Sequence, residues 1–123
     1  MLVNCSPEKW WGSHLILDCA KGNENVLSVE AIKKFVDDLV VEIEMEKHGE
    51  IQIDRFGEGD LVGISFCQFI KTSSIVGHFC DVSKNFYLDV FSCKRFHTSK
   101  VIECIRKHFD PEIVKHSLVE RGI

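Results

Sequence analysis

Hydrophobic and polar residues alternate in several short segments of the chain, with the period of two that is typical of β-strands. A nearly continuous apolar run over 61–70 instead predicts a central strand that is buried on both faces. The segments expected to form strands are 13–19, 51–56, 61–70, 75–79, 85–93 and 113–119.

Two longer segments place apolar residues three and four positions apart and predict amphipathic helices. The first follows Ser28, an N-cap type of residue, and its apolar stripe runs over 29–43. The second is expected to be capped by Thr98 or Ser99 and to stop at Asp110, before a proline.

The order of these elements, with hairpin-length links in the middle, predicts the α+β class. We expect a two-layer αβ sandwich, with a largely antiparallel sheet and two helices on one face, formed by a single domain over 13–123. Residues 1–12 lack a period and predict an irregular arm. Trp10 and Trp11 are adjacent and cannot both face one core; they indicate an interface or ligand lid, or ordinary packing.

Composition and charge narrow the function classes. The 123 residues carry a net charge of −4, so no general basic field would attract nucleic acid or anionic lipid. No apolar run is long enough for a membrane helix and no secretory signal is recognisable, so we expect a cytoplasmic domain. In that compartment most of the six cysteines are expected to be reduced core thiols; they are Cys5, Cys19, Cys67, Cys80, Cys93 and Cys104.

A polar break, Lys71-Thr-Ser-Ser74, separates two apolar segments. The break is typical of a tight turn whose hydroxyls cap backbone groups. It also has chemically capable neighbours: Ser65 lies eight residues before Ser73, His78 five residues after it and Cys93 twenty residues after it.

With these intervals, Gly63-x-Ser65, Ser73, His78 and Asp89-Val-Phe-Ser-Cys93 resemble the short prokaryotic S-adenosylmethionine decarboxylases. These are pyruvoyl-dependent enzymes made as self-cleaving proenzymes. The opening segment His14-Leu-Ile-Leu-Asp also resembles the first strand of that family, and the likeness spans residues 13 to 122.

The resemblance implies self-cleavage between Thr72 and Ser73, leaving a covalent pyruvoyl group derived from Ser73. Ser65 and His78 would assist processing by orienting the carbonyl and moving protons. The pyruvoyl ketone would form a Schiff base with the substrate amine and act as the electron sink for decarboxylation. Cys93 would then return a proton to the α-carbon. The family also implies a homodimer with sites near the subunit contact.

The chain departs from the family at three places, one of which is Ser74, where the family often has histidine. The scissile bond is Thr72-Ser73 where the family normally has Glu-Ser, and Phe79-Cys-Asp-Val82 replaces the Thr-Trp-Pro-Glu that usually follows the histidine. Two aromatic and two acidic side chains are therefore candidates for binding the nucleoside and its positive charge. They are Phe56, Phe79, Asp18 and Asp81.

Because the segment Phe79–Val82 differs from that of the family, two alternatives to an S-adenosylmethionine decarboxylase remain open. One is a pyruvoyl decarboxylase of a basic amino acid such as ornithine or arginine. The other is an unprocessed, non-catalytic homologue that binds a ligand or partner. Metal-ligand residue types occur in His78-x-Cys80 and Cys93-x3-His97, but their spacing lacks the paired Cys-x2-Cys of zinc sites, and we expect no metal.

Overall fold

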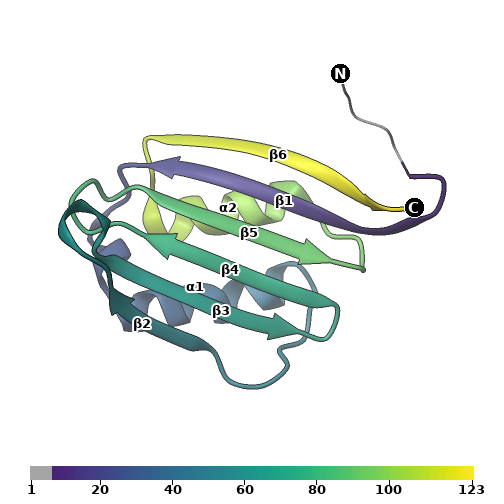
Figure 1. The fold of residues 1–123 in the computed structure, drawn as a ribbon, viewed down its shortest axis with the longest axis horizontal. Helices are drawn as coiled ribbons and strands as arrows, with labels where there is room; N and C mark the ends of the chain where they lie inside the picture. Colours follow the sequence, from purple (N-terminus) through teal and green to yellow (C-terminus); the bar gives the residue numbers. More distant parts are fainter. Residues whose placement is uncertain (1–6) are drawn as a thin grey trace.

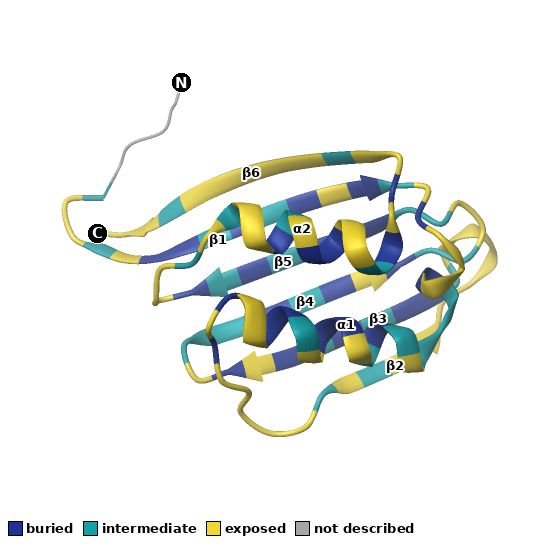
Figure 2. Ribbon diagram, turned by 180° about the vertical axis from the view of Figure 1, so that it is seen from behind, coloured by how far each residue is buried: buried dark blue, intermediate teal, exposed yellow. Residues whose placement is uncertain are grey.

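Six strands form one antiparallel sheet in the order β2-β3-β4-β5-β1-β6, and both helices cover the same face of it (Figures 1 and 2). The computed structural model describes residues 7–123. The strands are β1 Trp10–Ala20, β2 Gln52–Phe56, β3 Gly63–Ile70, β4 Ser73–Phe79, β5 Phe86–Ser92 and β6 Ile113–Gly122. The helices are α1 Val29–Glu42 and α2 Thr98–Phe109, with short 3-10 turns at Glu24–Leu27 and Gly59–Leu61. The predicted α+β sandwich is confirmed.

Helix α1 begins as expected, because the Ser28 hydroxyl accepts a hydrogen bond from the Ala31 amide at 3.1 Å. Helix α2 differs: its N-cap is His97, which makes no side-chain cap, so neither Thr98 nor Ser99 has the predicted capping role. The helix still ends at Asp110, which adopts a left-handed conformation at the C-cap.

The core lies between the helices and the inner face of the sheet. Alternate residues of the central strands point into it, as the period of two requires. Phe109 from α2 packs against Phe79 and Phe86, whose rings are stacked with centroids 5.1 Å apart. These three side chains are buried and connect α2 to β4 and β5.

Within residues 7–123, no helix lies over the outer face of the sheet, which we call the open face (Figures 1 and 2). The prediction that 61–70 is buried on both faces is therefore wrong for the single chain: Ser65 and Cys67 are half-buried and Phe69 is 59% exposed. The apolar run makes β3 apolar on both sides although only one side is covered. The large apolar side chains of the open face include Trp11, Phe56, Phe69, Tyr87, Phe91 and Val119.

Part of the predicted N-terminal arm is strand. Residues 10–12 belong to β1, which pairs with β6 across an irregularity between Trp10 and Gly12. Cys5 lies in residues 1–6, outside the described part of the chain. No helix within residues 7–123 is long and apolar enough to cross a membrane.

Candidate functional site

The polar break forms a tight hairpin between two central strands. Ile70 of β3 pairs with Ser73 of β4, so the turn contains only Lys71 and Thr72. The predicted turn hydroxyls of Ser73 and Ser74 instead begin β4. Ser73 has a φ of +149°, a conformation that residues with a Cβ rarely adopt, and such strain costs on the order of 1–3 kcal/mol.

The end of β5 lies directly against this hairpin. Ser73 pairs with Ser92, and the Cys93 amide donates a hydrogen bond to the Thr72 carbonyl at 2.8 Å. Cys93 itself is exposed. The fold thus brings Cys93 next to Thr72 and Ser73, about twenty residues earlier in the sequence. It also directs a backbone N–H at the carbonyl of the Thr72-Ser73 bond.

Ser65 and His78 form a second group. They face each other across β3 and β4, and the Ser65 Oγ lies 2.9 Å from the His78 Nδ1. His78 is exposed on the open face. It lies five residues along β4 from Ser73, which is about 17 Å at a strand rise of ~3.3 Å per residue. Within one chain, therefore, the serine–histidine pair does not reach the Thr72-Ser73 bond.

Among the aromatic candidates for substrate binding, Phe56 and Phe79 have opposite surroundings. Phe79 is 2% exposed and packs in the core, so its predicted role in binding the nucleoside is wrong. It follows His78 in a strand, and alternation turns it to the opposite face. Phe56 is 60% exposed and lines a depression of about 320 Å³ together with Ser65 and His78.

The two acidic candidates also differ. Asp81 forms an ion pair with Arg55, so a charged partner within the chain already neutralises it. Asp18 is exposed on the open face, and Tyr87 lies between it and His78 in one cross-strand row. Of the two carboxylates, only Asp18 is free to face a ligand on this surface.

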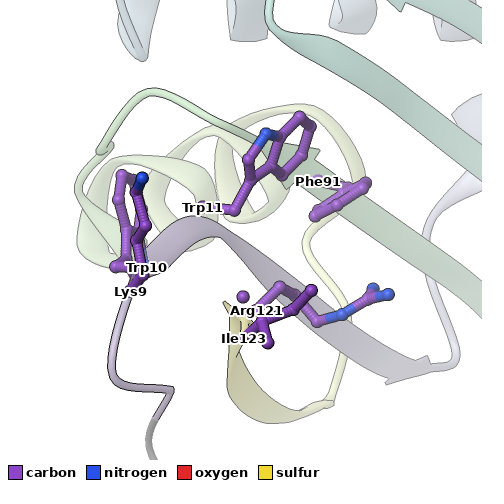
Figure 3. A pocket seen from close by; sticks show the side chains of 7 residues that line it. Lys9, Trp10, Trp11, Phe91, Arg121 and Ile123 are labelled. Carbon is purple, nitrogen blue, oxygen red and sulfur yellow. The ribbon is translucent and has the colours of Figure 1, made fainter.

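An aromatic pocket near the hairpin end of the sheet was not predicted as a unit. It has a volume of about 600 Å³ and includes Trp11, Phe91 and Arg121 (Figure 3). The Trp11 and Phe91 ring centroids are 5.5 Å apart, and the Arg121 guanidinium lies 5.0 Å from the Phe91 centroid. Alternation along the strand places Phe91 on the same face as Cys93. Trp11 and Arg121 join it only through the pairing of β1 with β5 and β6, and the sequence contains no signal for that register.

A hydrogen-bonded pair, His14 and Asp89, lies near the middle of the open face. The His14 Nε2 is 2.8 Å from the Asp89 Oδ1, and neither side chain is fully buried. Both residues belong to segments that carry the family resemblance, but the pair itself depends on the register of β1 against β5. It lies between the hairpin group and the serine–histidine pair.

The described thiols separate by their surroundings. Burial raises the pKa of both Cys19 and Cys104 to about 12, which keeps these core thiols protonated and unreactive. Cys67 and Cys80 are half-buried, and none of these five cysteines, Cys93 included, is in a disulfide. Cys93 is therefore the most accessible thiol among residues 7–123. The same residues contain no group of three histidine, cysteine or acidic side chains placed to hold a metal ion.

Comparisons with family models and with solved structures both find similar proteins. The sequence model of the S-adenosylmethionine decarboxylase family matches residues 13–122. Among solved structures, the adenosylmethionine decarboxylase from Aquifex aeolicus VF5 superposes with a TM-score of 0.78 at 21% identity, covering 94% of this chain and 93% of that one. A search of curated proteins returns no significant match.

Proposed function

This chain belongs to the S-adenosylmethionine decarboxylase family of lyases, and from that premise we propose that it cleaves its own Thr72-Ser73 bond and then decarboxylates S-adenosylmethionine for polyamine (spermidine) biosynthesis. The observation that carries the proposal is the hydrogen bond from the Cys93 amide to the Thr72 carbonyl. It polarises the carbonyl that the neighbouring serine must attack.

Self-cleavage would begin when the Ser73 Oγ attacks the Thr72 carbonyl carbon. The carbon–nitrogen bond breaks, the hydroxyl proton passes to the nitrogen, and an ester replaces the amide. Loss of the Ser73 α-proton then expels the Thr72 carboxylate and leaves a dehydroalanine, which water converts to a pyruvoyl group and ammonia. The products are residues 1–72 and a second chain derived from 73–123.

Two features of the hairpin support this first step. Negative charge would develop on the Thr72 oxygen as the serine attacks, and the Cys93 N–H, which donates to that oxygen, would stabilise the charge; one such donor contributes roughly 10²–10³-fold in rate. The positive φ of Ser73 also raises the free energy of the intact peptide relative to the cleaved one.

The surroundings of Ser73 fit the pyruvoyl group on which the family depends. The group is no larger than the serine residue that it replaces, and Ser73 is half-buried between Ile70 of β3 and the small side chain of Ser92 on β5. When formed, it supplies an electrophilic carbonyl that accepts the electrons released with CO2. Cys93, which follows the paired end of β5 and is exposed, is the thiol best placed to return a proton to the substrate α-carbon.

We propose a homodimer that pairs the open faces of two copies. The open face carries exposed aromatic side chains and a strand whose apolar run has no cover in one chain. A two-fold axis through its middle would bring the Ser65–His78 pair of one copy to the hairpin of the other. The pair could then orient the Thr72 carbonyl and move the protons that cleavage requires.

The residues that follow His78 leave the identity of the substrate open to a direct test against the basic amino acids. Phe79 is in the core and Asp81 is paired with Arg55, so neither replaces the aromatic and acidic residues that the family normally has after its histidine. Phe56 and Asp18 remain as exposed candidates for stacking and for charge. Release of labelled CO2 from S-adenosylmethionine, ornithine and arginine, compared in one assay, identifies the substrate.

Intact-mass spectrometry tests the cleavage itself. We expect two chains that meet between residues 72 and 73, the second blocked at its N-terminus and reactive towards carbonyl reagents. Ser73→Ala should remain a single chain. A wild-type protein that stays at 14.1 kDa after long incubation would refute the enzyme proposal and favour the non-catalytic homologue.

A further inference from the structure

Ser92, the last residue of β5, carries a hydroxyl group and has no exposed surface. A buried hydroxyl is costly unless its hydrogen bonds are made. Ser92 pairs with Ser73 on one side and with Ser13 on the other, so it lies beside the cleavage hairpin. Its contacts therefore bear on the geometry of the Thr72-Ser73 bond.

The hydroxyl of Ser92 is one link in a directed chain of hydrogen bonds. It accepts from the Lys94 amide at 2.9 Å and donates to the Thr72 Oγ1 at 2.9 Å. The Thr72 hydroxyl in turn donates to the Met45 sulfur at 3.3 Å. The Ser92 hydroxyl also lies 3.7 Å from the same sulfur, so the two hydroxyls and Met45 form one cluster in which the short Ser92–Thr72 hydrogen bond restricts the rotamer of Thr72.

Ser92, the last residue of β5, and Cys93, which follows it, thus hold Thr72 at two points. Ser92 binds its side chain, and the amide of Cys93 binds its carbonyl. These two hydrogen bonds, one to the side chain and one to the carbonyl of Thr72, restrict rotation about the bond between its Cα and its carbonyl carbon. The adjoining residue is held as well, because the Lys71 amide donates to the Glu46 carbonyl at 2.9 Å and their side chains form an ion pair at 2.9 Å.

We propose that Ser92 is a positioning residue for self-cleavage, which acts through the hydroxyl of Thr72 to keep the scissile carbonyl on the Cys93 amide and facing the Ser73 hydroxyl. The inference rests on the proposed self-cleavage. It also gives a physical role to the threonine that stands where the family has glutamate: its hydroxyl is the group that Ser92 holds.

The test compares cleavage half-times of purified precursors by intact mass. Ser92→Ala should slow cleavage by about 10²-fold, the order of loss that follows a misplacement of about 1 Å, and Ser92→Thr, which keeps the hydroxyl, should restore most of the rate. Ser13→Ala is the matched control. Ser13 is a buried serine that pairs with Ser92 across the strands, but its hydroxyl donates to Glu120 and not to Thr72. This variant should cleave like the wild type.

A double-mutant cycle separates positioning from a general effect on folding. Thr72→Val removes the hydroxyl that Ser92 holds, and it should slow cleavage to a similar extent. Adding Ser92→Ala to Thr72→Val should then cost little more. Hydroxylamine, which cleaves an ester, should not rescue Ser92→Ala, since the defect precedes ester formation.

The outcomes are distinguishable. If the wild type cleaves and Ser92→Ala cleaves equally fast, or if the two substitutions multiply, the inference is overturned and the proposed function stands. If the wild type does not cleave, both fall. If Ser92→Ala does not fold, as judged by its urea unfolding transition, Thr72→Val decides: an unchanged rate overturns the inference and a loss of about 10²-fold supports it.

Discussion

Self-cleavage of mixed variants tests whether two copies of the chain share one site. Ser73→Ala keeps the serine–histidine pair but has no attacking hydroxyl. His78→Ala keeps the hairpin but lacks the histidine of the serine–histidine pair. His78 is exposed, so its replacement should leave the fold intact. Neither variant alone should cleave at the wild-type rate.

The expected yield follows from the distance between the two groups. His78 is about 17 Å along β4 from Ser73, whereas a proton-transfer group must lie within about 3 Å of its target or act through one water. In the proposed dimer, a His78 that serves a given hairpin therefore comes from the other copy. With random pairing in a two-fold dimer, about half of the His78→Ala chains associate with a Ser73→Ala copy and receive its histidine. About half of the His78→Ala chains should then be cleaved.

The assay is co-refolding of the two variants in equal amounts, each with a tag of different mass, followed by intact-mass spectrometry. Every fragment should come from the His78→Ala chain, and the Ser73→Ala chain should stay whole. Each variant refolded alone is the control. Cleavage of His78→Ala alone at the wild-type rate would remove the histidine from the mechanism. An uncleaved mixture with demonstrated mixed dimers would refute the shared site.

Five further outcomes follow from the described contacts. Phe69→Lys, which places a charge on the open face, should convert the dimer to a monomer in light scattering; a persistent dimer would mean that another surface pairs. Cys93→Ala should cleave normally but release CO2 more slowly, and full turnover would exclude the thiol as proton donor. Burial raises the pKa of Cys19 and Cys104 to about 12, so iodoacetamide at pH 8 should spare both in the folded protein and modify Cys93. The unfolded chain releases these two protons near pH 9 and the folded chain does not, so stability should fall as pH rises above about 9; a double alanine variant at Cys19 and Cys104 should lose less stability between pH 8 and 10 in urea unfolding. Gly77→Ala places a methyl group against an aromatic ring of β3 and should destabilise the fold by about 1–3 kcal/mol; an unchanged urea midpoint would show that the ring moves freely.

The period of apolar residues predicted the strands and helices because it is a local signal, whereas capping predicted the start of α1 but not that of α2, where neither Thr98 nor Ser99 is the N-cap. The beginning of α1 at Ser28 is an example, since its cap is formed within four residues. The extent of β1 is a counterexample. Trp10 and Trp11 carry no alternation, and only pairing with β6 across an irregularity makes them strand. That pairing joins the two ends of the chain, which no local pattern encodes.

The candidate site was predictable where sequence interval and strand pairing agree. Ser73 and Cys93 are twenty residues apart and meet because β4 and β5 are neighbouring antiparallel strands. The intervals could not show that His78 is remote from Ser73, because distance along a strand grows with every residue. The burial of Phe79 could be predicted from the sequence, because alternation from the exposed His78 already places the Phe79 ring on the face covered by the helices.

Cleavage after Thr72 would divide the sheet between two polypeptides that interleave. The first would contain β1, β2 and β3, and the second β4, β5 and β6, while the strand order places β1 between β5 and β6. Neither piece can leave without breaking strand pairs on both sides of β1, so the nicked protein should persist as a non-covalent pair. Its renaturation would be second order: the uncleaved precursor would regain its fold at any dilution, whereas the mature enzyme would refold more slowly as its concentration falls.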